Sequence, residues 1–538
     1  MTKIAETAPP SRPGPPPAGD DTGRLEDASK GRLIAVLLLI VLFSELVPMQ
    51  YLLVTPAVQK VGLSFPSVGA NLSWMIIILG LVGGATSPLL GKLSDLYGKK
   101  RVLLAGGGVF LVGSVLCAVT SSWALFLTGR GLQATALGMA AVVPGLIRDL
   151  MPRRYVPMGI GLMGAGFGLS ALVSPFLAGM LTDHFGWRSI FWFLTLYTAV
   201  LAPVFWIVVP ETRLRVRQKL DWAGSILLGA GAALVLLYLS NGQAWGWNRP
   251  DALVYLGAGV VLLAGFYGWE KRTSEPIMDL ALLRAPRVAI VMAIGMLANM
   301  IIGAQSFMVP YMAQTDGELV RSSTIAAFAK EAGVSVEAMR EGLVFHGDIG
   351  YGLAFSLLSV AVYLTVWQST PSLLLGPASG AWARRVGLRL PYLISLVLMT
   401  LSMVLYAVSH SSWQVLAFIG LVYGLGYGVY NACAYNLIVE GVPQEQQGIG
   451  TGMFVLIGSF GSSAGIAILT SVLSAHPYQV STAERAGAPA RTTDIAHVYT
   501  DTGWTLGYWG LAAVGVAAVA LAYVMKAGRT PATGGSLH

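Results

Sequence analysis

Long apolar stretches alternate with short polar segments along most of the chain. Because a helix rises about 1.5 Å per residue, roughly 20 apolar residues cross a hydrocarbon layer of about 30 Å. Runs of this length recur about fourteen times, which predicts an all-α integral membrane protein with fourteen spans. We number the spans in chain order, and they are expected at residues 33–56, 72–92, 102–120, 123–147, 156–181, 189–209, 222–241, 252–269, 288–312, 350–381, 391–409, 413–439, 448–474 and 504–525.

Composition supports a membrane protein. Hydrophobic residues make up 55% of the 538 residues and charged residues 11%, whereas soluble proteins carry about 25% charged residues. Residues 1–31 are rich in Pro, Gly and charge, so we expect a disordered segment and no cleavable signal peptide. Cys117 and Cys433 lie in separate apolar runs, and this spacing predicts neither a metal site nor a disulfide framework.

Basic residues gather in the loops on one side of the predicted membrane. Those loops and the C-terminal tail carry 20 of the 34 Lys and Arg residues, the opposite loops carry 8, and the N-terminal segment carries 5. Cytoplasmic loops are enriched in Lys and Arg, so both termini are expected in the cytoplasm of a cell-membrane protein. The net charge of +8 therefore reflects topology, and we expect membrane lipid rather than nucleic acid as a partner.

Glu45 lies in the middle of the first apolar run. Twelve residues after Leu33, it is expected about 18 Å into the hydrocarbon layer. A carboxylate at that depth costs several kcal/mol unless it is protonated, paired or hydrated. We interpret Glu45 as a functional group. The alternative is a protonated glutamic acid that hydrogen-bonds neighbouring helices and has only a structural role.

Arg130 is the one basic residue well inside a predicted span. It lies about 11 Å from the outer end of span 4, which places it near the predicted depth of Glu45. Pairing between these two residues, directly or through water, would lower the cost of burying both. The alternative is that each charge belongs to a separate group of hydrogen bonds.

Two loops share a pattern that predicts an internal repeat. Gly91 and Gly98 enclose Asp95 in loop 2–3, and Gly380 and Gly387 stand at the same spacing in loop 10–11. Repeats in transporters place the substrate site between them, near mid-membrane. We expect a cytoplasmic segment 1–31, a six-helix bundle 32–209, an inserted helix pair with its linkers 210–285, a second six-helix bundle 286–526 and a cytoplasmic tail 527–538.

These motifs resemble those of the major facilitator superfamily. Its loop 2–3 signature, Gly-x-Leu-x-Asp-x-x-Gly followed by two basic residues, matches at Gly91, Leu93, Asp95, Gly98, Lys99 and Lys100. The segment from Arg130 to Ala136 resembles the helix-4 motif. Ser174, Pro175 and Gly179 resemble the helix-5 motif of the antiporters, with Ser174 in place of a glycine. Fourteen spans are typical of the drug:proton antiporter branch, so the chain is similar to fourteen-helix multidrug efflux proteins with two six-helix bundles and two inserted helices.

The resemblance implies roles for several residues. The gating loop, from Gly91 and Asp95 through Gly98, Lys99, Lys100 and Arg101, would act as a latch for the outward-facing conformation; the alternative is a basic loop that only sets topology. The helix-5 motif would form a hinge and a seal against protons, or simply pack closely. The branch usually has an aspartate about nine residues before a proline in helix 1. The corresponding position here, counted from Pro56, is Val47, so only the role of proton coupling is carried over to Glu45, with Arg130 beside it.

Polar and aromatic residues within the spans predict a substrate cavity. One acid among many apolar groups suits small lipophilic, amphipathic or monocationic molecules better than sugars or phosphates. Any one of these residues has an alternative role in hydrogen bonding between helices or at the lipid interface. The candidates are Glu45, Gln50, Tyr51, Gln133, Asn299, Gln305, Tyr427, Tyr430, Asn431, Tyr435 and Asn436.

Two outer loops are long, at residues 313–349 and 475–503. The first has helical periodicity interrupted at Gly333, with Ser335 as an N-cap, and predicts two short helices; a solvated connector is the alternative. Run 10 exceeds one simple span and contains Pro371, so we expect it to extend beyond the bilayer or to break.

The sequence predicts an exporter of lipophilic compounds driven by the proton gradient through alternating access. No Walker motif is present, and we find neither a nucleophile–base pair nor a metal constellation, so we expect no enzyme activity, cofactor or metal. A proton-coupled uptake permease or lipid transporter on the same fold is the nearest alternative. A receptor or scaffold that does not transport is a more remote one. We expect a monomer.

Overall fold

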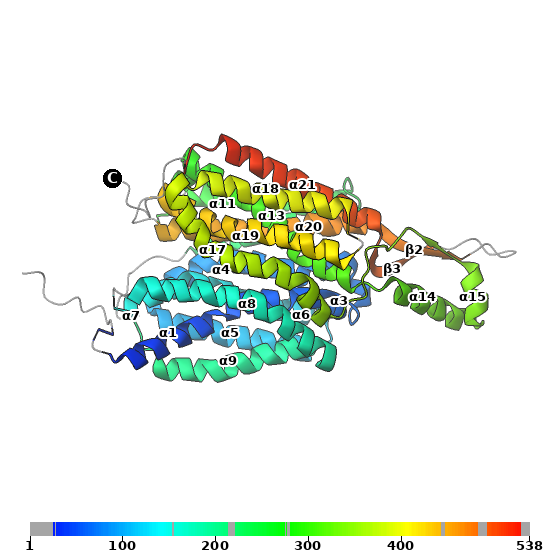
Figure 1. The fold of residues 1–538 in the computed structure, drawn as a ribbon, viewed down its shortest axis with the longest axis horizontal. Coiled ribbons are helices and arrows are strands. Elements are labelled where there is room, and N and C mark those ends of the chain that lie inside the picture. Colours follow the sequence, from blue (N-terminus) through cyan, green and yellow to red (C-terminus); the bar gives the residue numbers. More distant parts are fainter. Residues whose placement is uncertain are drawn as a thin grey trace, which may run out of the picture.

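The computed structural model consists mainly of long helices that run side by side (Figure 1). It describes residues 25–528 except 27, 153–154, 213–220, 275, 277–279, 411, 443–446 and 483–491. The helices of the first half are α1 (Lys30–Ser44), α2 (Leu46–Leu52), α3 (Val58–Gly62), α4 (Trp74–Tyr97), α5 (Lys99–Val119), α6 (Trp123–Ala134), α7 (Met139–Leu150), α8 (Val156–Phe185) and α9 (Arg188–Val208), with the 3-10 turns η1 (Thr55–Ala57), η2 (Pro66–Ser73) and η3 (Thr135–Gly138).

The remaining elements include three strands as well as helices. The strands are β1 (Leu343–His346), β2 (Pro477–Thr482) and β3 (Thr492–Tyr499). The helices are α10 (Trp222–Trp245), α11 (Pro250–Glu270), α12 (Leu280–Arg284), α13 (Pro286–Gln314), α14 (Gly317–Ala332), α15 (Val336–Gly342), α16 (Leu357–Val360), the π-helical η5 (Ala361–Thr365), α17 (Val366–Val386), α18 (Arg389–Val408), α19 (Trp413–Gly441), α20 (Gln447–Ser474) and α21 (Asp501–Val524).

The helices agree with a protein that crosses the membrane many times. Among the described residues, 12 helical segments are long and apolar enough to span a bilayer. Two further helices, α4 with 24 residues and α8 with 30, lie where spans 2 and 5 were expected. The multi-pass architecture is therefore confirmed, and the count of fourteen spans stays a prediction.

Two prolines lie within predicted spans, and they have different effects. Pro48 breaks the first span, whereas Pro371 does not break the tenth. Pro48 has no N–H to donate to the carbonyl of Ser44, one turn earlier, and its ring crowds that carbonyl. The first span accordingly divides into α1 and α2, with Glu45 at the junction. In the tenth span, helix begins at Leu357, and Pro371 lies within α17 without interrupting it.

The helices fall into two groups, and a further pair packs against them. In the first group α5 packs on α6 and α9, and in the second α13 packs on α20 while α18 packs on α19 and α21. Figure 1 shows α1, α5 and α9 on one side of the molecule and α18 and α21 on the opposite side. The pair α10 and α11 pack together, and α10 contacts α4 and α20. The bundle boundaries at 32–209, 210–285 and 286–526 stay predictions.

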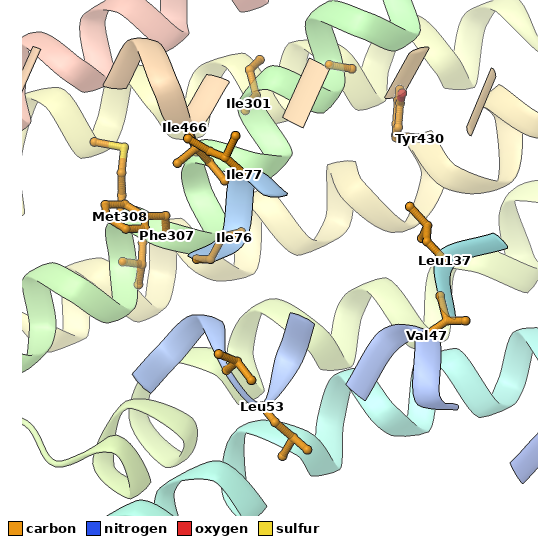
Figure 2. Close-up of a cluster of buried hydrophobic side chains, with 14 of the residues drawn as sticks. Val47, Leu53, Ile76, Ile77, Leu137, Ile301, Phe307, Met308, Tyr430 and Ile466 are labelled. Atoms are coloured by element: carbon orange, nitrogen blue, oxygen red, sulfur yellow. The ribbon is translucent and has the colours of Figure 1, made fainter. Parts of the chain in front are cut away.

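Apolar side chains from both groups form one buried cluster. Figure 2 shows Ile76 and Ile77 of α4 lying beside Ile466 of α20, while Leu53 comes from the first span. Within a bilayer, close packing of such side chains is stabilised by van der Waals contact, since lipid is as apolar as they are. This packing places α4 and α20 where the two groups meet.

A small sheet and two helices project from one end of the helical body (Figure 1). The strands form an antiparallel sheet in the order β1-β2-β3, with Leu343 opposite Thr482. We call this the sheet end and the opposite end, which carries loop 2–3, the loop end. The short helices confirm the prediction for residues 313–349, because Gly333 ends α14 with a φ of 65° and the Ser335 side chain caps α15. The sheet itself was not predicted.

Candidate functional site

Glu45 is buried at the junction of α1 and α2, with 6% of its surface exposed. The Ser170 hydroxyl of α8 donates a hydrogen bond to its Oε2. Gly166 lies one turn away on α8, and a Cβ atom there would overlap Oε1 of Glu45. Oε1 is buried and has no hydrogen-bond partner among the described residues. The first span therefore presents its acid to α8 rather than to lipid.

Arg130 is fully buried in α6, and neutral oxygens surround its guanidinium. Its Nε donates to the carbonyl of Met75 at 2.9 Å, Nη2 donates to the carbonyl of Gln50 at 3.2 Å, and Nη1 donates to Oε1 of Gln133 at 2.5 Å. The Phe191 ring centroid lies 5.8 Å from the guanidinium carbon. These contacts connect α2, α4, α6 and α9 around one positive charge.

The direct pairing predicted between Glu45 and Arg130 is not formed in this structure. Glu45 faces Ser170 on α8, whereas Arg130 points toward the carbonyls of Gln50 and Met75. The depth estimate placed the two residues along the helix axes but said nothing about which helix each side chain faces. Coupling through water, or in another conformation, stays a prediction.

The other candidates of the first half lie close to Arg130. Gln50 is fully buried, and its side-chain amide has no partner among the described residues. Tyr51 is half-buried on α2. Gln133 is fully buried and donates from Nε2 to the Ser114 hydroxyl at 2.7 Å, which links α6 to α5. Gln133 therefore acts in part as an interhelical hydrogen-bonding residue, which was the alternative to a cavity role.

The candidates of the second half lie mainly on α19, among aromatic rings. Asn299 of α13 donates from Nδ2 to the Tyr430 hydroxyl at 3.1 Å, and the Tyr430 ring stacks on Tyr392 with centroids 5.6 Å apart. Tyr435 is 44% exposed, and its ring contacts Phe454 of α20 edge-on, with centroids 5.4 Å apart. Together they form an aromatic face on the second group of helices.

The remaining candidates differ in exposure. Tyr427 and Asn431 are half-buried, and Asn431 donates from Nδ2 to the carbonyl of Tyr427 at 3.2 Å. Asn436 is exposed and donates to the carbonyl of Ala432 at 2.7 Å. Gln305 of α13 is 1% exposed. The two asparagines therefore bond to their own helix through one amide hydrogen each, and their roles in a cavity stay predictions.

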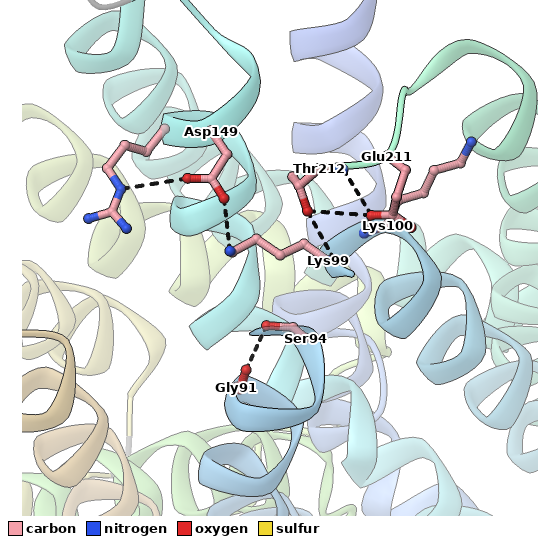
Figure 3. Close-up of polar contacts among 8 residues, drawn as sticks. Gly91, Ser94, Lys99, Lys100, Asp149, Glu211 and Thr212 are labelled. Atoms are coloured by element: carbon pink, nitrogen blue, oxygen red, sulfur yellow. Dashed lines mark hydrogen bonds and ion pairs between the residues drawn. The ribbon is translucent and has the colours of Figure 1, made fainter. Parts of the chain in front are cut away.

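The gating loop is anchored by an acid that the sequence analysis did not select (Figure 3). The Glu211 carboxylate accepts hydrogen bonds from the backbone N–H groups of Lys100 at 3.0 Å and Arg101 at 3.1 Å, at the start of α5. Gly98 has a φ of 103°, and a Cβ atom there would lie 2.7 Å from Glu211 Cδ. The second glycine of the motif thus permits both the turn and the approach of the acid.

A buried ion pair joins the same loop to α7. Lys99 Nζ lies 2.8 Å from Asp149 Oδ2, and both side chains are buried (Figure 3). Gly91 accepts a hydrogen bond through its carbonyl from the Ser94 hydroxyl at 2.6 Å. Asp95 lies on α4, and its side chain is outside the described part of the structure. The only sequence signal for Glu211 and Asp149 was that they are acidic residues on the side of the membrane where basic residues predominate.

The helix-5 motif lies where α8 meets the second group of helices. Gly179 packs directly on the backbone of Leu358 in α16, and a Cβ atom at Gly179 would overlap it. One turn later, Asp183 Oδ2 accepts a hydrogen bond from Leu358 N at 3.2 Å. Ser174 is buried, and Pro175 lies inside α8. The motif glycine is therefore a contact point between the two groups, while its role as a hinge or proton seal stays a prediction.

Further contacts between the two groups lie near the sheet end. The Gln59 side chain of α3 donates from Nε2 to the hydroxyl of Thr315, just after α13, at 3.0 Å. The Gln314 side chain, at the end of α13, donates to the carbonyl of Pro56 in η1 at 2.7 Å. These bonds and the α8–α16 contact close the sheet end.

The family follows from this fold and a comparison with known proteins. The family model described as Major Facilitator Superfamily matches residues 34–339 and 291–536. The chain belongs to the major facilitator superfamily. It is therefore a membrane transporter and not an enzyme, as the sequence motifs predicted.

This superfamily member is similar in sequence to several named transporters. It is 30% identical over 255 residues to the MFS-type transporter YvkA of Bacillus subtilis (strain 168), covering 47% of this chain and 56% of that protein. It is 27% identical to a "Probable actinorhodin transporter" of Streptomyces coelicolor (strain ATCC BAA-471 / A3(2) / M145), covering 86% and 76%. It is 26% identical to "Multidrug resistance protein Stp" of Mycobacterium tuberculosis (strain CDC 1551 / Oshkosh), covering 79% and 73%.

A solved transporter structure shows the same fold. The crystal structure of the POT family transporter PepTSo aligns with a TM-score of 0.58 at 13% identity, covering 91% of this chain and 97% of that one. At this identity the likeness concerns the fold alone. This member of the superfamily thus shares an arrangement of helices with transporters whose sequences have diverged widely.

Proposed function

We propose that this transporter exports lipophilic or amphipathic compounds, including monocationic ones, in exchange for protons. The observation that carries the proposal is Glu45, a buried carboxyl group with one oxygen unpartnered among the described residues, at a break in the first span. Burial favours the protonated form, and hydration or a nearby cation favours release of the proton. The relative named a multidrug resistance protein supports export.

Glu45 is placed to respond to movement between the two groups of helices. Its neighbours Gly166 and Ser170 lie on α8, the helix whose Gly179 packs on α16 in the other group. A displacement of α8 when the sheet end opens would change the surroundings of the carboxyl group. Conversely, loss of its proton would leave a buried charge beside α8, which disfavours the closed packing. Proton binding and gate position are then linked.

We propose that the sheet end faces the outside of the cell membrane and that both termini are cytoplasmic. The excess of basic residues in the loops at the loop end supports this orientation. The contacts between the two groups at the sheet end support the proposal that this conformation is closed toward the outside. In this conformation substrate would enter from the cytoplasm or the inner leaflet.

The proposed substrate class rests on the aromatic face of α19. The half-exposed ring of Tyr435 offers apolar surface and a cation–π contact to a lipophilic cation, and the buried ring of Tyr430, stacked on Tyr392, packs the same helix behind it. Glu45 on the first group of helices would supply the negative charge. We propose a monomer that needs no cofactor beyond the proton gradient.

Transport by proteoliposomes under an imposed pH gradient tests the proposal. We expect a labelled quaternary ammonium compound to accumulate in vesicles that are acidic inside, because protons leaving the vesicle exchange for substrate entering it. Glu45→Gln should abolish accumulation, whereas the matched variant Glu337→Gln, on exposed α15, should retain it.

Each other outcome contradicts the proposal. Accumulation in vesicles that are alkaline inside would indicate a proton-coupled uptake permease. Gradient-independent movement of labelled lipid would indicate a lipid transporter, and no movement of any compound would indicate a receptor or scaffold. Wild-type transport by Glu45→Gln would remove this residue from the coupling mechanism.

A further inference from the structure

The sheet has a register shift between β2 and β3, and His497 lies within it, facing the first group of helices. In the pairing of β2 with β3, Gln479 stands opposite Asp494 and Pro477 stands opposite Tyr499, so four residues of β3 face one residue of β2. His497 lies in this bulge and has a φ of 60°, an uncommon value for a residue with a side chain. Such a conformation persists only where the surrounding contacts favour it.

The imidazole of His497 bridges the two groups of helices. Its Nε2 lies 3.4 Å from the carbonyl of Phe65, just before η2 in the first group, and β3 as a whole packs on η2. A Cβ atom at Gly62 of α3 would lie 3.6 Å from the ring carbon Cδ2. The backbone carbonyl of His497 accepts a hydrogen bond of 2.7 Å from the Tyr311 hydroxyl of α13, in the second group. The residue is thus fixed to one group and contacts the other.

The surroundings of the ring favour neutral imidazole. Nδ1 is buried and has no partner among the described residues, so a proton added there would meet no acceptor in the closed conformation. Burial lowers the pKa of His497 below its usual value, and the hydrogen bond to the carbonyl of Phe65 partly opposes that shift. The charged form is therefore disfavoured as long as the sheet end is closed.

Few other ionisable groups lie on the elements around the ring. η2 has no titratable side chain. On α3, Lys60 is exposed. The remaining titratable or charged groups on the packed elements are Tyr311 on α13, with Arg287 at the opposite end of that helix, Tyr478 on β2 with Arg321 of α14 hydrogen-bonded to it, and Asp494 and Tyr499 on β3.

We propose that His497 is a proton-sensitive latch of the outer gate, and that protonation from the outside releases it from Phe65 and opens the sheet end. The proposal rests on the orientation and alternating access given under the proposed function. The latch would favour the outward-open conformation where protons are abundant, which is the conformation in which an antiporter loads its proton from outside.

The direction of the pH effect follows from linkage. In the open conformation water reaches the ring, so its pKa returns toward the ordinary value of about 6.5. Above that pH the neutral ring is compatible with both conformations. As the outside pH falls through it, the open conformation binds a proton more tightly than the closed one and gains population. Each unit of pKa difference between the two conformations changes their ratio by up to about tenfold.

Distances between two spin labels across the sheet end can measure this shift. Leu63→Cys in the first group and Val344→Cys on β1 place labels at exposed positions, while the native cysteines Cys117 and Cys433 are buried. For the full chain in lipid nanodiscs, we expect the ratio of long to short distances to rise about two- to tenfold between about pH 7.5 and about pH 5.5. His497→Gln, which stays neutral, should remove most of that rise.

Two further variants provide controls. His346→Gln makes the same change on the same sheet, at an exposed residue whose ring contacts the Ser481 hydroxyl, and it should keep the full pH response. His497→Lys introduces a permanent charge and should favour long distances at both pH values. If His497→Gln and the parent respond equally to pH, or if His497→Lys stays closed, the latch is wrong.

The distance measurement separates this proposal from the proposed export function. A Glu45→Gln chain that has lost proton-driven transport should still open on acidification if His497 is the sensor. Loss of the pH response in Glu45→Gln together with a retained response in His497→Gln would assign pH sensing to Glu45 and overturn the latch.

Discussion

The two ends of the molecule are held together by different chemistry. At the loop end, Lys99 and Asp149 form a buried ion pair within the first group of helices, and Glu211, just after α9, caps α5 with a full negative charge. At the sheet end, the two groups meet through hydrogen bonds such as Gln314 to the Pro56 carbonyl. A buried ion pair stabilises one bundle, whereas the contacts described between the bundles are mostly neutral hydrogen bonds, apart from the Asp183 carboxylate that accepts from Leu358 N.

The proposed alternating access requires such a difference between the two ends. A gate opens and closes once in every transport cycle, so each of its contacts must be weak. A bundle that moves as a rigid unit gains from contacts that are costly to break. The comparison can be tested by removing contacts at each end.

The largest effect is expected at the buried ion pair. Asp149→Asn would break the buried ion pair with Lys99, and removing one partner of such a pair typically costs about 3–5 kcal/mol. We expect a large fall in the thermal unfolding temperature of the purified protein. The double variant Lys99→Met with Asp149→Leu should recover much of the loss, since it removes both charges. An unchanged unfolding temperature in Asp149→Asn would show that the pair does not stabilise the bundle.

A smaller effect is expected at the turn of the same loop. Gly98→Ala places a Cβ atom at a φ of 103° and 2.7 Å from Glu211 Cδ, so we expect a loss of about 1–3 kcal/mol in the free energy of unfolding. Gly91→Ala is the matched control in the same motif, because a Cβ atom there meets nothing within 4 Å. Equal stability of the two variants, measured by thermal unfolding, would contradict the special role of Gly98.

The smallest effect is expected at the sheet end. Gln314→Leu removes the hydrogen bond to the Pro56 carbonyl, a contact between bundles worth about 0.5–1.5 kcal/mol. We expect little change in unfolding temperature and a shift of the spin-label distances toward the open form. A matched leucine substitution at exposed Gln414, on α19, should leave the distances unchanged. A fall in stability as large as that of Asp149→Asn would erase the contrast between the two ends.

The helical architecture was predictable because it depends on local patterns. Apolar runs of span length located the helices, and Gly333 with Ser335 located the end of α14 and the start of α15, since a left-handed residue and an N-cap act within a few residues. The sheet was not predictable in this way. It pairs Leu343 with Thr482, residues 139 positions apart, and its strands are short.

The candidate site was predictable only where it depends on local sequence patterns. The motif identified Gly98 and Lys99, but not their partners Glu211 and Asp149, because sequence spacing does not show which helix ends meet in space. Hydropathy placed Glu45 within the membrane, but only packing against α8 shows that it faces Ser170 rather than Arg130.

The central claim is that export and proton entry are linked through Glu45. The most direct test applies an outward gradient of a quaternary ammonium compound to proteoliposomes without a pH gradient and follows the internal pH with a trapped dye. The account predicts that substrate leaving the vesicle acidifies the interior, and that Glu45→Gln abolishes this acidification. Alkalinisation of the interior, or substrate efflux with no change in internal pH, would contradict it.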